Sequence, residues 1–182
     1  MNHYKFFLTE KVFPQISLES KILEIGCGSN SIFEDQQFKN VTAIDKSLDC
    51  ILSAPENSLV NYLAQDITKS FVEKDFDLIV DSHAIHCILD IDHRQLALKN
   101  IYQSLKPNGL LVSEMMIKKK SSDPYSLFPE RLILSSFEVE EELLKNGFKL
   151  KYFYISPDLY FLDDVSMKNK CDVLRVIAEK VV

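Results

Sequence analysis

Short, mostly apolar segments alternate along this chain with segments whose apolar residues recur every three or four positions. The first pattern predicts strands and the second predicts helices. The expected strands are residues 21–25, 41–45, 59–64, 76–81, 110–117, 148–156 and 171–180. The expected helices are residues 4–13, 47–54, 93–106 and 137–146, and residues 29–38 are expected to form a short helix or a turn.

This alternation of strands and helices indicates an α/β fold, in which a mostly parallel sheet carries helices on both faces. The segment 76–81 (FDLIVD) has the continuous apolar character of a buried parallel strand. Residues 157–170 are polar and offer no crossover helix, so the last two strands are expected to be antiparallel neighbours. We expect one domain, 1–182, with a helical cap at 1–20 and a lid or insertion at 118–136.

The composition excludes several classes of protein. The net charge is −6, from 21 Lys and Arg against 27 Asp and Glu, whereas a nucleic-acid-binding protein needs a basic face. No apolar run approaches the roughly 20 residues that span a bilayer, and the first residues have no signal-peptide layout. The four cysteines are far apart and are expected to be reduced thiols. We therefore expect a cytoplasmic protein with neither nucleic acid nor membrane as a partner.

Glycine is scarce, since the chain has 4 where about 13 would be usual for its length. Two of them, Gly26 and Gly28, follow the first strand in the segment ILEIGCGSN. A glycine loop at the carboxyl end of a sheet strand brings bare backbone close to a ligand. Asp45 ends the next strand, 19 residues after Gly26, and can accept hydrogen bonds from a ribose. This arrangement predicts a cofactor that contains a nucleoside.

Three features distinguish between such cofactors. The chain has no Gly-x-x-x-x-Gly-Lys-Ser/Thr segment, which argues against ATP or GTP hydrolysis. Ser31 replaces the third glycine of the dinucleotide fingerprint, which argues against NAD or FAD. Glu24 precedes Gly26 by two positions, and a carboxylate there suits a cofactor with a cationic amino-acid part.

Together these segments resemble the class I S-adenosylmethionine-dependent methyltransferases over nearly the whole chain. ILEIGCGSN is similar to the family's first motif, VTAIDKS to the second, and LAQDIT to the segment beside the adenine. FDLIVDSHAIHCI is similar to the fourth-strand motif and LKPNGLLVSEM to the fifth-strand motif. One departure is Asn30, which replaces the usual third glycine of the first motif. The resemblance implies a Rossmann-like seven-stranded sheet of order 3-2-1-4-5-7-6 with an antiparallel C-terminal strand.

The resemblance also implies a cofactor site for S-adenosylmethionine, with S-adenosylhomocysteine as the product. Asp45 would bind the ribose, and Asp66 would lie near the adenine amino group, although Asp66 alone could be a cap for the following turn. Asp81 and Ser82 would line the methionine end of the pocket. The residues expected to bind the cofactor are Glu24, Gly26, Cys27, Gly28, Asp45, Lys46, Asp66, Ile67, Asp81 and Ser82.

Two histidines follow the fourth strand, where the methyl acceptor is expected. Imidazole titrates near neutrality, so His83 or His86 could take a proton from the acceptor, with packing or capping as the alternative for each. No metal is expected, because the spacing of these histidines with Cys87 and His93 matches no closed zinc motif.

Aromatic side chains from two further segments could close over the acceptor. They are Tyr4, Phe6 and Phe7 in the first helix and Tyr125 and Phe128 in the insertion. Ordinary core packing is the alternative for each of them.

The sequence therefore predicts a methyltransferase that acts on a small-molecule acceptor, since the chain is about as long as a catalytic core alone. The first alternative is a protein methyltransferase for lysine or another side chain, although DSHAIHC departs from the pattern of those enzymes. The chain also lacks the Asn/Asp-Pro-Pro-Tyr motif of enzymes that methylate amides and nucleobases. The second alternative is a non-catalytic regulatory subunit that binds S-adenosylmethionine, against which the presence of Glu24, Asp45 and Asp66 argues.

Overall fold

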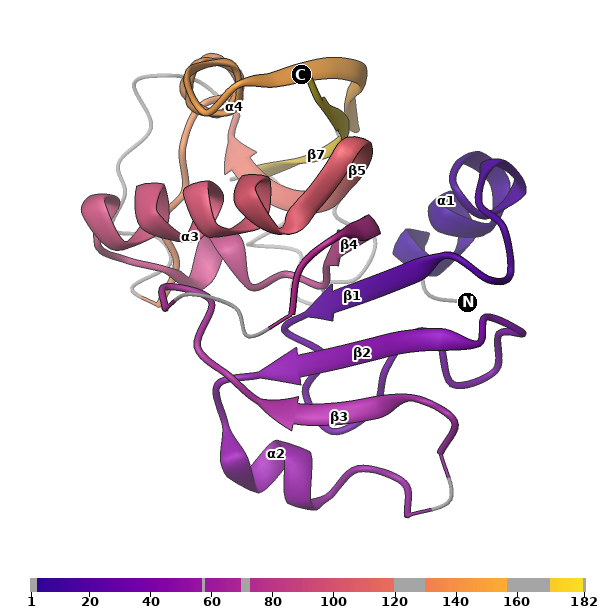
Figure 1. Cartoon of the computed structure of the whole chain (residues 1–182). Helices are drawn as coiled ribbons and strands as arrows, with labels where there is room; N and C mark the ends of the chain where they lie inside the picture. Colours follow the sequence, from indigo (N-terminus) through magenta and orange to yellow (C-terminus); the bar gives the residue numbers. More distant parts are fainter. Residues whose placement is uncertain (1–2, 57, 70–72, 120–129, 157–170, 182) are drawn as a thin grey trace.

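A computed structural model of the chain describes residues 3–56, 58–69, 73–119, 130–156 and 171–181. Its centre is a seven-stranded sheet of order β3-β2-β1-β4-β5-β7-β6 (Figure 1). The strands are β1 (Lys21–Ile25), β2 (Asn40–Asp45), β3 (Asn61–Ala64), β4 (Phe76–Asp81), β5 (Leu105–Lys118), β6 (Phe148–Ser156) and β7 (Cys171–Lys180). β1 to β5 pair in parallel, whereas β7 is antiparallel to β5 and β6. The expected α/β fold, strand order and antiparallel C-terminal strand are confirmed.

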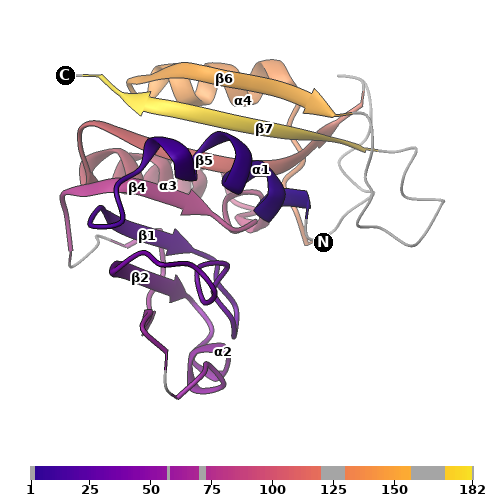
Figure 2. The same cartoon turned by 90° about the vertical axis from the view of Figure 1, so that its right-hand side faces the viewer.

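Helices cover both faces of this sheet. α1 (His3–Lys11) lies on one face, and α3 (Ile91–Ser104) and α4 (Ser136–Lys145) lie on the other (Figure 2). The short helix α2 (Leu48–Leu52) lies beside β3, and two 3-10 turns, η1 (Phe13–Gln15) and η2 (Ile85–Cys87), follow α1 and β4. Within the described ranges, every helix is too short or too polar to cross a bilayer.

The buried strands contribute to a hydrophobic core on each side of the sheet. In β4, Leu78 and Val80 pack in one cluster with Leu8 of α1. Ile79, between them, points the other way and packs with Ile101 of α3. Because both faces of β4 are covered, the strand is apolar almost throughout, as its sequence indicated.

Side-chain caps fix the starts of three helices. Ser47 and Asp90 each accept a hydrogen bond from the backbone N–H three residues further on, at 3.3 and 2.8 Å. At α4 a capping box forms, in which Ser135 accepts from the N–H of Glu138 and the Glu138 carboxylate accepts from the N–H of Ser135, at 3.2 and 2.7 Å.

The expected boundaries differ from the structure mainly around β5. This strand begins directly after α3, at Leu105 rather than at residue 110, and a register shift separates its first pairing with β4 from the rest. Near the start of β5 the left-handed conformation belongs to Asn108, with φ +62°, and not to Gly109. Gly109 is needed for space instead, because a Cβ there would lie 2.9 Å from the carbonyl oxygen of Phe76. Residues 29–38 form turns without a helix.

The expected lid or insertion at 118–136 lies partly outside the described residues, and so do Tyr125 and Phe128. In the described part, the N–H of Leu132 donates to the carbonyl of His86, and the N–H of Lys118 donates to the carbonyl of Leu134, both at 2.8 Å. Residues 132–134 therefore run beside the end of β5 and the turn that follows β4. Whether 118–136 closes over a site stays a prediction.

Candidate active site

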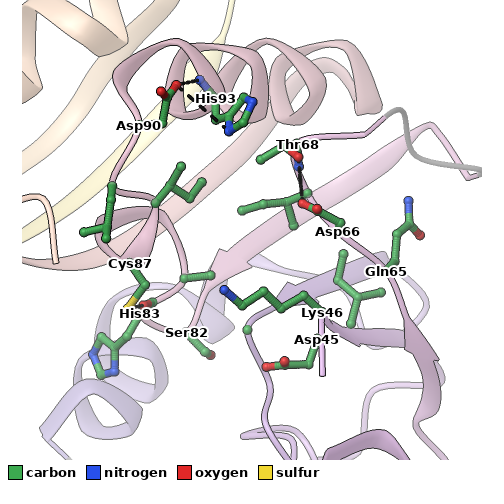
Figure 3. Close-up of a pocket in the computed structure, with 16 residues that line it drawn as sticks. Asp45, Lys46, Gln65, Asp66, Thr68, Ser82, His83, Cys87, Asp90 and His93 are labelled. Carbon is green, nitrogen blue, oxygen red and sulfur yellow. Dashed lines mark hydrogen bonds and ion pairs between the residues drawn. The ribbon is translucent and has the colours of Figure 1, made fainter. Parts of the chain in front are cut away.

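The carboxyl ends of β1, β2 and β4 meet at one edge of the sheet, where open α/β sheets bind their ligands. A cavity of about 580 Å³ lies there, within the size range of cofactor sites (Figure 3). The expected site residues in its lining are Gly26, Asp45, Lys46, Asp66, Ile67, Ser82 and His83. The expected residues outside its lining are Glu24, Cys27, Gly28, Asp81 and His86.

The glycine loop leaves β1 in a conformation that favours glycine. Gly26 has φ +75° and Gly28 has φ +59°. The N–H groups of Gly26 and Cys27 both donate to the carbonyl of Ile44, at 2.8 and 3.2 Å, so the loop stays bonded to β2 as it turns. A Cβ at Gly26 would lie 2.7 Å from the Cβ of Ala84. Position 26 therefore needs glycine for its backbone conformation and for the close approach of the loop after β4.

Asp45 joins the glycine loop to the start of α2. Its Oδ2 accepts from the N–H of Gly28 at 3.0 Å, and its Oδ1 accepts from the N–H of Ser47 at 2.9 Å. A carboxylate has about four acceptor positions, so an Asp45 fixed in this way can still accept hydrogen bonds from a diol. The predicted ribose contact fits this position at the cavity wall (Figure 3).

Glu24 is buried beneath the glycine loop. Its carboxylate accepts hydrogen bonds from the hydroxyls of Ser31 and Ser82, the latter at 2.6 Å, and from the N–H of Ile32 at 3.2 Å. Burial raises the pKa of Glu24, and these hydrogen bonds act in the opposite direction. Glu24 thus ties the loop after β1 to the loop after β4. Its predicted contact with the cofactor's amino-acid part stays a prediction.

The cysteines fit the expectation of ordinary thiols. Cys27 packs in the core on the α1 side, and burial raises the pKa of its thiol to about 12, so it stays protonated at neutral pH. All four cysteines lie in the described ranges, and none of them forms a disulfide there. Cys87 is exposed and lines the cavity. Among the described side chains, no group of three His, Cys, Asp or Glu is arranged to hold a metal ion.

The opposite wall of the cavity follows β2 and β3. Asp66 Oδ1 accepts hydrogen bonds from the N–H and the hydroxyl of Thr68, at 2.9 and 2.8 Å, and these bonds lower the pKa of Asp66. Asp66 therefore caps the turn that follows it and also lines the cavity. Ile67 adds apolar surface beside it, and the Lys46 side chain extends into the space next to Asp45 (Figure 3). An adenine contact by Asp66 stays a prediction.

Asp81 is fully buried at the end of β4. Its Oδ1 accepts from the N–H groups of Ala84 and Ile85, at 2.7 and 3.1 Å, and its Oδ2 accepts from the hydroxyl of Ser113 at 2.5 Å. Burial raises the pKa of Asp81, opposed by these hydrogen bonds. Asp81 thus shapes the loop after β4, whereas Ser82, the next residue, lines the cavity itself.

His83 lies on the side of the cavity that faces α1. Its φ of +69° is a left-handed conformation, uncommon for any residue other than glycine. The ring points away from Asp66 and toward α1, where its centroid lies 5.6 Å from that of Tyr4 (Figure 3). Its Nε2 lies 3.1 Å from Oε1 of Glu114 on β5. His83 was predicted from the sequence, whereas Glu114 was not, because its position looks like any other position of a strand.

His86 is buried in η2, with 3% of its surface exposed. Within the described chain, its Nδ1 has no hydrogen-bond partner. Burial lowers the pKa of His86 to about 3, and His83, Arg131 and Arg94 contribute in the same direction. The ring is therefore neutral and a weak proton acceptor at neutral pH. This geometry favours the packing interpretation for His86 and leaves His83 as the better candidate for a base.

A buried ion pair supports the turn after β4. Arg94 of α3 places its Nε 2.8 Å from Oε1 of Glu142 on α4, and its Nη1 donates to the carbonyl of Ile85 at 2.8 Å. Both side chains are almost fully buried. The sequence does not predict this pair, because the two residues are 48 positions apart and each fits the polar face of an amphipathic helix. The pair attaches the turn that carries His86 to α3 and α4.

Comparison with known proteins shows the family of this chain. The chain matches the family model of a methyltransferase domain over residues 23–113, half of its length. It is 28% identical over 144 residues to a ubiquinone biosynthesis O-methyltransferase of Rickettsia prowazekii, which covers 74% of this chain and 56% of that protein. It is 35% identical over 99 residues to the mitochondrial arginine-hydroxylase NDUFAF5 of Mus musculus, covering 51% of this chain and 28% of that protein. The chain thus spans about half, or less, of the relatives' lengths.

A solved structure extends the comparison to the whole fold. The S-adenosylmethionine-dependent methyltransferase of Methanosarcina mazei superposes with a TM-score of 0.76 at 19% identity, covering 94% of this chain and 97% of that chain. At this identity the similarity shows the fold, and the family model adds the match over the motif-bearing half of the chain. This protein belongs to the methyltransferase-domain family, and it has the fold of the S-adenosylmethionine-dependent methyltransferases.

Proposed function

We propose that this protein transfers the methyl group of S-adenosylmethionine to a small-molecule acceptor held between the cavity and α1. The observation that carries the proposal is the position of His83, which lines the cavity and contacts Tyr4 of α1. The loop after β4 and α1 thus bound the proposed acceptor space from two sides. Such a bounded space favours a small acceptor over the surface of a protein. The relative named as a ubiquinone biosynthesis O-methyltransferase supports the same class of acceptor.

Five residues of the cavity wall have a proposed part in holding the cofactor. Asp45 accepts hydrogen bonds from the ribose, and Asp66 lies at the adenine with Ile67 against its face. Gly26 lets the cofactor approach bare backbone, and Ser82 lies at the methionine end. When bound, S-adenosylmethionine supplies a methyl group on a positively charged sulfur.

The residues behind the wall keep this arrangement rigid. Glu24 and Asp81 are buried and hydrogen-bonded to the loops after β1 and β4, and Arg94 holds the following turn. Methyl transfer depends mainly on alignment of the acceptor with the methyl carbon and on exclusion of water. A loop fixed at several points serves both requirements, because the side chains it presents keep their geometry while the acceptor binds.

The test follows the methyl label. The purified protein is incubated with methyl-labelled S-adenosylmethionine and, in separate reactions, with a low-mass metabolite extract and a protein extract. We expect label in the low-mass fraction, and an Asp45→Ala variant should transfer less of it. Label in the protein fraction alone would contradict a small acceptor. Tight binding of S-adenosylhomocysteine without transfer to either fraction would favour the non-catalytic subunit.

One relative gives a specific reason to analyse the products further. The relative of 35% identity is named as an arginine-hydroxylase, an activity that transfers no methyl group. Mass spectrometry of both extracts separates a gain of a methyl group from a gain of an oxygen atom. Oxygen without label in any product would contradict methyl transfer by this protein.

A further inference from the structure

A series of polar contacts leads from the cavity to the last strand of the sheet. His83 Nε2 lies 3.1 Å from Oε1 of Glu114, and Oε2 of Glu114 accepts from Nε of Arg175 on β7 at 2.6 Å. The side chain of His83 is 42% exposed, that of Glu114 is 3% exposed and that of Arg175 is 18% exposed. A buried carboxylate thus lies between an imidazole at the cavity and a guanidinium that is always charged.

The His83 ring is fixed by more than this hydrogen bond. The ring centroids of Tyr4 and His86 lie 5.6 and 5.8 Å from that of His83, and the carbonyl of His83 accepts from the thiol of Cys87 at 3.2 Å. The left-handed backbone at His83 costs about 1–3 kcal/mol, and such strain persists where the surrounding structure imposes it. Strained backbones of this kind cluster at functional sites. The structure therefore holds the imidazole in one orientation at the cavity.

We infer that Glu114, held by Arg175, is a positioning residue that keeps a proton on Nε2 of His83 and so prepares Nδ1 to take a proton from a hydroxyl acceptor. The inference rests on the proposed function. A carboxylate can only accept hydrogen bonds, so the ring nitrogen that faces Glu114 carries the hydrogen. In the neutral ring, the lone pair is then on Nδ1. The geometry follows the logic of catalytic triads, in which a buried carboxylate sets the tautomer of a histidine base.

The acceptor oxygen forms a bond to the methyl carbon while the carbon–sulfur bond breaks, and the electron pair of that bond stays on the sulfur. The hydroxyl proton passes to Nδ1 of His83. The products are a methyl ether, S-adenosylhomocysteine and an imidazolium, which then releases its proton to water. The negative charge of Glu114 stabilises the imidazolium as it forms.

A hydroxyl is the class of acceptor that needs a histidine base oriented in this way. An amine can lose its proton to water before transfer and then attack through its lone pair. A hydroxyl oxygen keeps its proton until the transfer itself, so a base positioned beside it lowers the barrier, typically by a factor of about 10² to 10⁴ in rate.

The test determines which ring nitrogen of His83 carries the hydrogen, by ¹⁵N NMR of the histidine side chains with S-adenosylhomocysteine bound. The chain has 4 histidines, so the spectrum is simple. We expect neutral His83 in the Nε2–H form. In Glu114→Gln, the amide oxygen should stay on Arg175 and the amide NH₂ should donate to Nε2, which moves the ring proton to Nδ1. The control is Glu179→Gln, which removes a β7 carboxylate that pairs with Lys151 at 3.4 Å and should keep the wild-type form.

The outcomes separate this inference from the proposed function. An Nδ1–H form in the wild type, or an unchanged form in Glu114→Gln, would overturn the inference, and the wild-type spectrum decides even if the variant fails to fold. The rate of label transfer to the low-mass extract should fall by about 10² to 10⁴ in Glu114→Gln, whereas its affinity for S-adenosylhomocysteine should be unchanged. An unchanged rate also overturns the inference. Absence of S-adenosylhomocysteine binding by the wild type would contradict the proposed function instead.

Discussion

The buried imidazole of His86 makes the folded protein sensitive to acid. Burial lowers the pKa of His86 to about 3, whereas the same group in an unfolded chain has a pKa of about 6.5. Between these two values the unfolded chain binds more protons than the folded chain. The free energy of unfolding therefore falls as the pH drops below about 6.5, by roughly 5 kcal/mol over the whole window. This is comparable with the total stability of many domains, about 5–15 kcal/mol.

The substitution His86→Phe isolates this contribution, because it keeps a ring of similar size that cannot take a proton. Between pH 7 and pH 5 the wild type should lose about 2 kcal/mol more of its free energy of unfolding than the variant. Burial raises the pKa of Glu24 and Asp81, so their contributions are lost as the pH rises and have the opposite sign. Both carboxyl groups are present in the wild type and in His86→Phe, so their contributions cancel when the two proteins are compared. Urea unfolding at several pH values measures the difference between the two proteins in the free energy of unfolding.

A matched control separates burial from the mere loss of a histidine. His93 has a side chain that is 66% exposed, so His93→Phe should follow the wild-type dependence on pH. At pH 7, His86→Phe should be at least as stable as the wild type, because the variant no longer buries an Nδ1 without a partner. Parallel curves for the wild type and His86→Phe between pH 7 and pH 5 would refute the reasoning.

Three further substitutions test other parts of the structure. Asp45→Ala should weaken the binding of S-adenosylhomocysteine by about 1–3 kcal/mol in calorimetry, whereas Asp49→Ala, in the first turn of α2, should not change it. Gly26→Ala should lower the free energy of unfolding by about 1–3 kcal/mol more than Gly28→Ala, because only at position 26 would the new Cβ meet a neighbour within 4 Å; equal losses would contradict the steric argument. Arg94→Met should cost about 3–5 kcal/mol in urea unfolding, because it leaves a buried carboxylate unpaired, and a loss below about 1 kcal/mol would contradict that burial.

The fold follows from features that lie close together in the sequence. Strand 76–81 is apolar on both faces, and segments such as 47–54 carry their own cap at Ser47, so the elements are predictable without tertiary contacts. The strand order was implied by the family resemblance. Boundaries were less predictable, since the start of β5 depends on pairing between Phe76 and Leu105 across the sheet. The same holds for Gly109, whose need for space arises from the carbonyl of Phe76.

In the candidate site, too, some residues are predictable from the sequence and others are not. Asp45 was predictable, because its distance from the glycine loop is short and fixed by one strand–loop–strand unit. The contacts of Ser82 with Glu24 and of Glu114 with Arg175 join residues 58 and 61 positions apart. A serine or a glutamate in a strand sequence carries no local signal of such a partner. Only the order of strands β1, β4, β5 and β7 brings these groups together.

The central claim is that the cavity at the carboxyl ends of β1, β2 and β4 holds the methyl donor. A crystal structure of the protein with S-adenosylhomocysteine tests it most directly. We predict the ribose hydroxyls within hydrogen-bond distance of Asp45 and the sulfur on the side of Ser82 and His83. A ligand in the neighbouring cavity of about 550 Å³, which is lined by Leu63, Lys69 and other residues near β3, would contradict the account.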